Sequence, residues 1–115
     1  MSALLDKQQQ FAMMLGEFLV WLYQNGYRVT LGEVWRSPQE AALNAQSGVG
    51  IANSLHTQKL AADLNIFRID GTLLETVTEL LPAGEQWESQ GGSWGGRFHK
   101  PDADHFSLSP DGVTR

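Results

Sequence analysis

The chain has 115 residues, 42% hydrophobic and 18% charged, a composition too apolar for a disordered chain and too polar for a membrane protein. There is no cysteine, which excludes disulfides, cysteine-based zinc or iron–sulfur sites and thiol nucleophiles. The 13 acidic residues outnumber the 8 basic ones, and no Lys/Arg cluster is present, so we expect no nucleic-acid binding. This length leaves little room for a second core, and we expect a single domain over residues 1–115.

The first half of the chain predicts a helix, a strand and a second helix. Apolar side chains recur at steps of three and four, which predicts one long amphipathic helix over residues 3–25. The β-branched and aromatic residues of 27–35 are typical of a strand. Ser37 and Glu40 then match a capping box, which predicts a helix to about residue 48.

A glycine-bearing loop after residue 48 leads to His56 and then to a second set of elements. Residues 63–69 read as a strand that ends at a turn with the sequence Asp-Gly. Thr72 and Glu75 match another capping box, and we expect the helix that they begin to end before Pro82.

The C-terminal part predicts a glycine-rich loop followed by a hairpin. Residues 83–93 are polar and suit one helical turn and then a loop. Residues 94–98 and 105–109 are expected to form two short strands that bracket a turn at 100–102. The elements together predict the α+β class, with helices packed on a small antiparallel sheet.

The side chains suited to chemistry lie in two segments, one in the middle of the chain and one near its C-terminus. A catalytic zinc site takes three protein ligands, keeps a position for water, and needs a separate base beside that water. His56 and Asp63 offer two ligands, and His105 offers a third. Asp102, three residues before His105 at a turn, offers the base.

Each of these residues also has a plainer interpretation, which spacing alone leaves open. A histidine and an aspartate seven residues apart also suit a surface histidine near an acidic turn, and the run from Asp102 to His105 also suits a solvated turn. His99 is a competing ligand by type, but its place beside Lys100 favours a solvent-facing side chain. Trp94, before two glycines, suits either the core or a substrate groove.

Together the two segments resemble the zinc D-alanyl-D-alanine carboxypeptidase and L-alanyl-D-glutamate peptidase family (VanY-like metallopeptidases), which includes phage endolysins. The first family motif, Ser-x-His-x4-Ala-x-Asp, is matched by Ser54, His56, Ala61 and Asp63. The second, Trp-Gly-Gly followed by Asp-x-x-His-Phe, is matched by Trp94, Gly95, Gly96, Asp102, His105 and Phe106. A third element that opens a helix is matched by Arg36, Ser37, Pro38 and Glu40. The order and separation of the motifs agree with the family over residues 30–109.

The resemblance implies a LAS-type (hedgehog/D,D-peptidase-like) zinc peptidase fold and a set of site residues. One zinc ion would be bound by His56, Asp63 and His105, with Asp102 as the general base. The substrate would be contacted by Arg36, Ser54 and Trp94, with Arg36 on a carboxylate or the developing oxyanion. Asp104 stands where many relatives have proline, so Asp102 and Asp104 are both candidates for the base. The same ligand types also accept manganese or cobalt.

The implied function is an endolysin that hydrolyses the L-alanyl–D-glutamate bond of the peptidoglycan stem peptide and so lyses the bacterial cell wall. Two alternatives stay open: a zinc D-alanyl-D-alanine carboxypeptidase with the same ligands, and a non-catalytic module that binds cell-wall peptides. The N-terminus has no basic region followed by a cleavage site. We therefore expect synthesis in the host cytoplasm without a signal peptide, holin-dependent release to periplasmic peptidoglycan, no stable membrane insertion and a monomeric protein.

Overall fold

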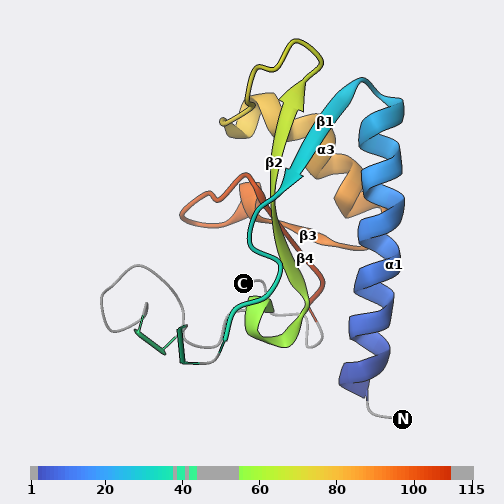
Figure 1. Ribbon diagram of the computed structural model, residues 1–115. Coiled ribbons are helices and arrows are strands. Elements are labelled where there is room, and N and C mark those ends of the chain that lie inside the picture. The colour runs from blue at the N-terminus through green and yellow to red at the C-terminus, as the bar shows by residue number, and fades with distance from the viewer. Residues whose placement is uncertain (1–2, 38, 41, 44–54, 110–115) are drawn as a thin grey trace.

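The computed structural model describes residues 3–37, 39–40, 42–43 and 55–109, which form an α+β fold (Figure 1). In chain order the elements are α1 (Ala3–Gln24), β1 (Tyr27–Leu31), the 3-10 helix η1 (Leu55–Gln58), β2 (Ala61–Arg68), α3 (Val77–Ser89), β3 (Ser93–Trp94), the 3-10 helix η2 (Gly95–Arg97) and β4 (His105–Ser107). The predicted fold class is confirmed. Within these ranges no helix is long and apolar enough to cross a bilayer.

The four strands form one antiparallel sheet in the order β1-β2-β4-β3. The long strand β2 lies in the interior of the sheet and pairs with two different neighbours along its length. Its second half, from Leu64 onward, pairs with β1, and its first half, up to Asp63, pairs with β4. Asp63 therefore sits where three strands come together.

The hydrophobic core lies on the sheet face that the two long helices cover. Phe18 of α1, Trp87 of α3 and Phe106 of β4 are fully buried and contact one another, with ring centroids 5.0 to 6.1 Å apart. The Trp87 indole N–H also donates to the Ser107 carbonyl at 3.0 Å, which ties α3 to β4. This aromatic cluster fixes the position of β4 relative to both helices.

The N-terminal elements follow the prediction closely. The helix expected over 3–25 is α1, whereas the strand expected over 27–35 ends at Leu31. The Ser37 hydroxyl accepts a hydrogen bond from the Glu40 amide at 3.0 Å, as a helix cap does, and residues 39, 40, 42 and 43 are helical. The rest of that predicted helix lies outside the described residues.

The helix predicted to start at Thr72 was placed wrongly. The chain holds two Thr-x-x-Glu sequences four residues apart, and the second, Thr76 to Glu79, caps α3 in both directions. The first is not helical, because the Leu74 amide donates to the Ile66 carbonyl at 2.9 Å and extends the sheet. Pro82 lies inside α3 rather than after it. The helix continues through the segment predicted as loop because it buries Trp87.

Candidate active site

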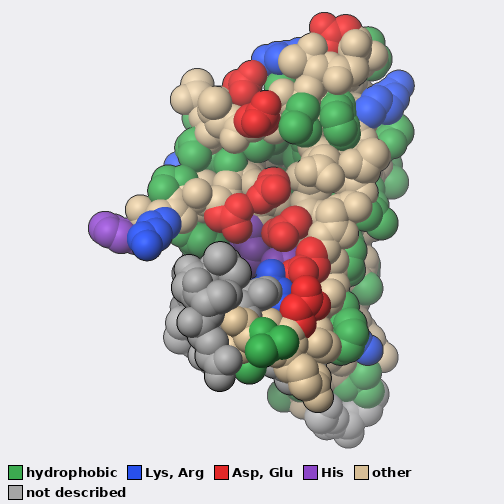
Figure 2. Space-filling view, turned by 60° about the vertical axis from the view of Figure 1, so that its left-hand side comes forward, with side chains coloured by type: hydrophobic (Ala, Val, Ile, Leu, Met, Phe, Trp, Pro, Cys, Tyr) green, Lys and Arg blue, Asp and Glu red, His purple; other side chains and the backbone are tan. Residues whose placement is uncertain are grey.

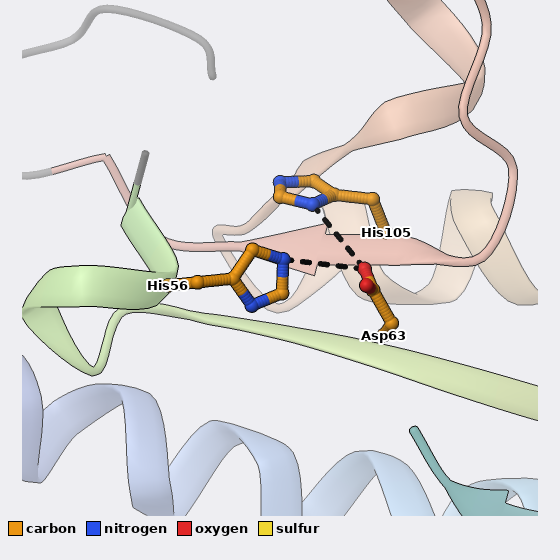
Figure 3. Close-up of side chains that lie close together, drawn as sticks. All are labelled: His56, Asp63 and His105. Carbon is orange, nitrogen blue, oxygen red and sulfur yellow. Dashed lines mark ion pairs between the residues drawn. The ribbon is translucent and has the colours of Figure 1, made fainter. Parts of the chain in front are cut away.

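The structure brings the three expected ligands together. His56, Asp63 and His105 each present a ligand atom, and these atoms all lie within 4.8 Å of one another. His56 Nε2 lies 3.3 Å and His105 Nδ1 lies 3.6 Å from the same carboxylate oxygen, Asp63 Oδ1 (Figure 3). The two imidazole rings meet edge to face, with centroids 5.2 Å apart.

Strand register explains why Asp63 and His105 meet. They are direct partners in the antiparallel pair β2–β4, so their side chains leave the sheet on the same face. Their neighbours Leu64 and Phe106 point to the opposite face and are buried in the core. His56 comes from η1, beside the buried Leu55, and completes the cluster from outside the sheet.

The chemistry of the cluster fits a divalent metal. Two imidazole nitrogens and a carboxylate oxygen are the donors that zinc takes in catalytic sites. Asp63 Oδ1 is buried and makes no hydrogen bond within the described part of the chain. Burial alone would raise the pKa of Asp63, but the two histidines outweigh it and hold that pKa well below its ordinary value. Asp63 is therefore an ionised carboxylate with one buried oxygen, a group that a cation would stabilise.

A cluster of carboxylates adjoins the histidine cluster and shares Asp63 with it. Oxygens of Asp63, Asp102 and Asp104 lie within 4.8 Å of one another. Figure 2 shows acidic side chains gathered around a recess in which histidine is visible. Burial, with the nearby charges of Asp102 and Asp63, raises the pKa of Asp104 to about 7. Asp102 is solvent-exposed and Asp104 half-buried, so both candidate bases stand beside the expected ligands.

Close packing at Gly95 positions Asp102 and His105. The Asp102 amide donates to the Gly95 carbonyl at 2.9 Å, and the His105 amide donates to the Asp102 carbonyl at 3.1 Å. A Cβ on Gly95 would lie 2.1 Å from the Asp102 carbonyl oxygen and 2.8 Å from the His105 Cβ. Only glycine fits there, which gives the Trp-Gly-Gly motif a structural reason.

The expectation that Trp94 contacts substrate does not agree with its position. Its side chain is 1% exposed, and its indole N–H donates to the Ala103 carbonyl at 2.8 Å. Gly84 of α3 leaves the space that the indole ring fills. Trp94 thus anchors the loop that carries Asp102. Ser54, the other expected substrate contact, lies outside the described residues.

Arg36 lies beside the histidine cluster, with a companion that the sequence analysis missed. The Arg36 amide donates to the His56 carbonyl at 3.2 Å, and its guanidinium forms an ion pair with Glu33. Glu33 Oε1 also lies 3.7 Å from His56 Nδ1. A signal was present in the sequence, since Glu33 is an acidic residue three positions before the motif arginine.

A pocket of about 310 Å³ opens beside the carboxylates. Its wall combines apolar and polar side chains and is formed by Leu64, Asn65, Leu73, Leu74, Glu75, Leu80, Pro101, Asp102, Ala103 and Asp104. Asp102 and Asp104 belong to this wall and also lie close to Asp63, so the pocket adjoins the histidine cluster.

The chain is similar to known proteins in fold and in sequence. In fold the chain is similar to the L-Ala D-Glu endopeptidase ChiX of Serratia marcescens, with a TM-score of 0.57 and 19% sequence identity; the match covers 70% of this chain and 66% of that one, slightly less than two thirds. No curated protein matches the chain. A family model described as D-alanyl-D-alanine carboxypeptidase matches residues 47–108, more than half of the sequence. This match spans His56, Asp63 and His105, and the chain belongs to the D-alanyl-D-alanine carboxypeptidase family.

Proposed function

We propose that the chain is a zinc-dependent peptidoglycan peptidase of the endolysin type, which hydrolyses the L-alanyl–D-glutamate bond of the stem peptide. The observation that carries this proposal is the cluster of His56, Asp63 and His105 with the Asp102 carboxylate beside it. Likeness in fold to an L-Ala D-Glu endopeptidase supports the choice of bond. Under this proposal residues 1–115 form one catalytic domain, which acts as a monomer on periplasmic peptidoglycan after holin-dependent release.

His56, Asp63 and His105 would hold the zinc ion. When bound, zinc supplies a Lewis acid that polarises a carbonyl and lowers the pKa of water towards neutrality. Asp102 is exposed at the rim of the site, where it can take a proton from the attacking water and deliver it to the leaving amine. Asp104 would act through Asp102, or replace it as the base.

Arg36 and the pocket would bind the stem peptide on either side of these groups. The planar guanidinium of Arg36 suits a substrate carboxylate or the developing oxyanion, and its side chain remains 15% exposed. The pocket beyond Asp102 has room for part of the peptide, with apolar contacts from Leu73 and Leu74. Ser54 would add a further polar contact.

A second candidate is a zinc D-alanyl-D-alanine carboxypeptidase. The description of the matched family favours it directly. It would use the same three ligands and the same base, so it differs from the first candidate only in how the peptide lies in the pocket.

Mass spectrometry of purified peptidoglycan after incubation with the zinc-loaded protein distinguishes the two. We expect new L-alanine ends on the glycan and free peptides that begin with D-glutamate, both lost on addition of a chelator. Loss of terminal D-alanine alone would assign the carboxypeptidase activity instead. No product from a protein with verified zinc would contradict both enzyme functions and favour a module that only binds cell-wall peptides.

A further inference from the structure

Glu33 occupies an irregular position at the end of β1. The Gly32 amide donates to the Asp63 carbonyl at 2.8 Å, and the Asp63 amide donates to the Glu33 carbonyl at 2.8 Å. Two residues of one strand thus oppose a single residue of the other, which is the pattern of a β-bulge. A Cβ at Gly32 would lie 2.9 Å from the Asp63 carbonyl oxygen, so the two strands approach closely here. The main chain of Glu33 is therefore fixed to the main chain of Asp63.

The side chain of Glu33 reaches two further members of the site. Its Oε1 atom is buried, forms an ion pair with Arg36 and lies 3.7 Å from His56 Nδ1. A closer approach of about 1 Å would bring this pair to the length of a charge-assisted hydrogen bond. The same Glu33 oxygen thus pairs with Arg36 and faces the ring of His56.

The two nitrogens of His56 face different carboxylates. Nε2 lies 3.3 Å from Asp63 Oδ1 and points into the cluster, whereas Nδ1 faces Glu33. A metal ion binds a nitrogen lone pair, so Nε2 can act as a ligand only when the ring proton is on Nδ1. A carboxylate that accepts a hydrogen bond from Nδ1 selects that tautomer and strengthens the ligand.

We propose that Glu33 is a positioning residue of the metal centre, which fixes the tautomer of His56 and the direction of the Arg36 guanidinium together. This inference rests on the proposed function, because it takes His56 as a zinc ligand and Arg36 as a substrate contact. Glu33 itself touches neither metal nor substrate.

The test is the zinc affinity of Glu33→Gln, measured by competition with a chelator on protein stripped of metal. Glutamine has nearly the same shape, but it removes the charge that favours the Nδ1–H tautomer. We expect binding about 10- to 100-fold weaker than in the wild type. The matched control is Glu88→Gln, since Glu88 also pairs with an arginine, Arg97, through contacts of 3.0 Å, but on the exposed surface of α3. The control should bind zinc as the wild type does.

Three further measurements separate positioning from a merely structural role. Nitrogen-15 shifts of the zinc-loaded wild type should show His56 protonated at Nδ1, with a weaker hydrogen bond at that proton in Glu33→Gln. Glu33→Asp, which keeps the charge on a shorter stem, should recover part of the zinc affinity and keeps the test available if the glutamine variant fails to fold. In peptidoglycan digestion, Glu33→Gln saturated with zinc should show a raised KM, because Arg36 is no longer held.

The outcomes distinguish this inference from the proposed function. If the wild type binds no zinc, both the zinc-dependent function and the inference that rests on it are contradicted. If the wild type binds zinc and Glu33→Gln binds it equally well, only the positioning role is overturned. A zinc-loaded protein that cuts no peptidoglycan would contradict the proposed activity, while the affinity and nitrogen shifts would still test the role of Glu33 towards His56.

Discussion

The two faces of the β2–β4 pair carry opposite chemistry on the same two strands. Leu64 and Phe106 face the helices and are fully buried among apolar side chains. Their neighbours Asp63 and His105 face the other way and meet His56. Strand alternation alone accounts for this division. Stability and chemistry are thus assigned to alternate residues of the strands, so each face should be open to change without the other.

The two faces also differ in what they contribute to the stability of the folded state. The helix-covered face buries aromatic rings, and removing this apolar surface from water lowers the free energy of the folded state. The other face crowds Asp63, Asp102 and Asp104 together, and their repulsion contributes to the raised pKa of Asp104. Such a cluster lowers the stability of the fold unless a bound cation or a proton neutralises part of its charge. The two faces should therefore respond separately to substitution.

The largest expected effect is loss of metal and activity on His105→Ala. The variant removes one of three clustered ligands, so we expect no stoichiometric zinc and no peptidoglycan cleavage. The packing of the helix-covered face should remain intact, and the far-UV circular dichroism should match that of the metal-free wild type. Zinc content and product release measure the effect. Full activity in the purified variant would exclude His105 as a ligand.

Next in size is the effect of Asp102→Asn. Asparagine keeps the shape but cannot accept a proton, so turnover should fall about 10²- to 10⁴-fold while zinc content is unchanged. Asp104→Asn, two residues away in the same loop, is the paired variant and should retain much more activity. If Asp104→Asn is the inactive one, the roles of the two carboxylates are reversed.

Phe18→Ala in α1 tests the helix-covered face of the sheet. Phe18 is fully buried against Trp87 and Phe106, so its truncation should lower the free energy of unfolding by about 3–5 kcal/mol. The control Val20→Ala lies on the same helix, where Val20 is 56% exposed, and should change stability by about 0.5 kcal/mol or less. Denaturant unfolding of the metal-free protein gives both values. Zinc affinity lost in proportion to stability would show that the two faces are coupled.

Local sequence patterns predicted the parts of the fold that depend on near neighbours. The period of α1 was sufficient to place it. The start of α3 was not predictable, since Thr72 and Thr76 begin the same capping pattern. What decides between them is the hydrogen bond from Leu74 to Ile66, a contact between segments that sequence periodicity does not reveal.

The same division applies to the site. Spacing alone left open whether His56, Asp63 and His105 meet, and the resemblance to the peptidase family predicted it. Strand register brings Asp63 and His105 opposite each other. Trp94 was expected in the substrate groove, but space left by Gly84 in a different element buries it. Glu33 was missed because a bulge, and not strand periodicity, places it beside His56.

The smallest expected effect is a pH dependence of stability that the acidic cluster gives to the metal-free protein. The pKa of Asp104 is about 7 in the folded chain against an ordinary 3.8, so between these values the folded state binds a proton that the unfolded state has released. Stability should therefore fall as pH rises from about 4 to 7. Asp63 has the opposite sign, because its lowered pKa makes a contribution that is lost as pH falls below its ordinary value of 3.8.

Comparison of melting temperatures from pH 4 to 8 isolates the Asp104 contribution. The difference between the wild type and Asp104→Asn removes every contribution that the two proteins share. We expect the wild type to lose stability relative to Asp104→Asn as pH rises. Zinc should flatten this difference, because a cation beside three carboxylates favours their ionised forms and lowers the pKa of Asp104. An equal slope in both metal-free proteins would mean that Asp104 ionises freely and that the repulsion on this face of the sheet is small.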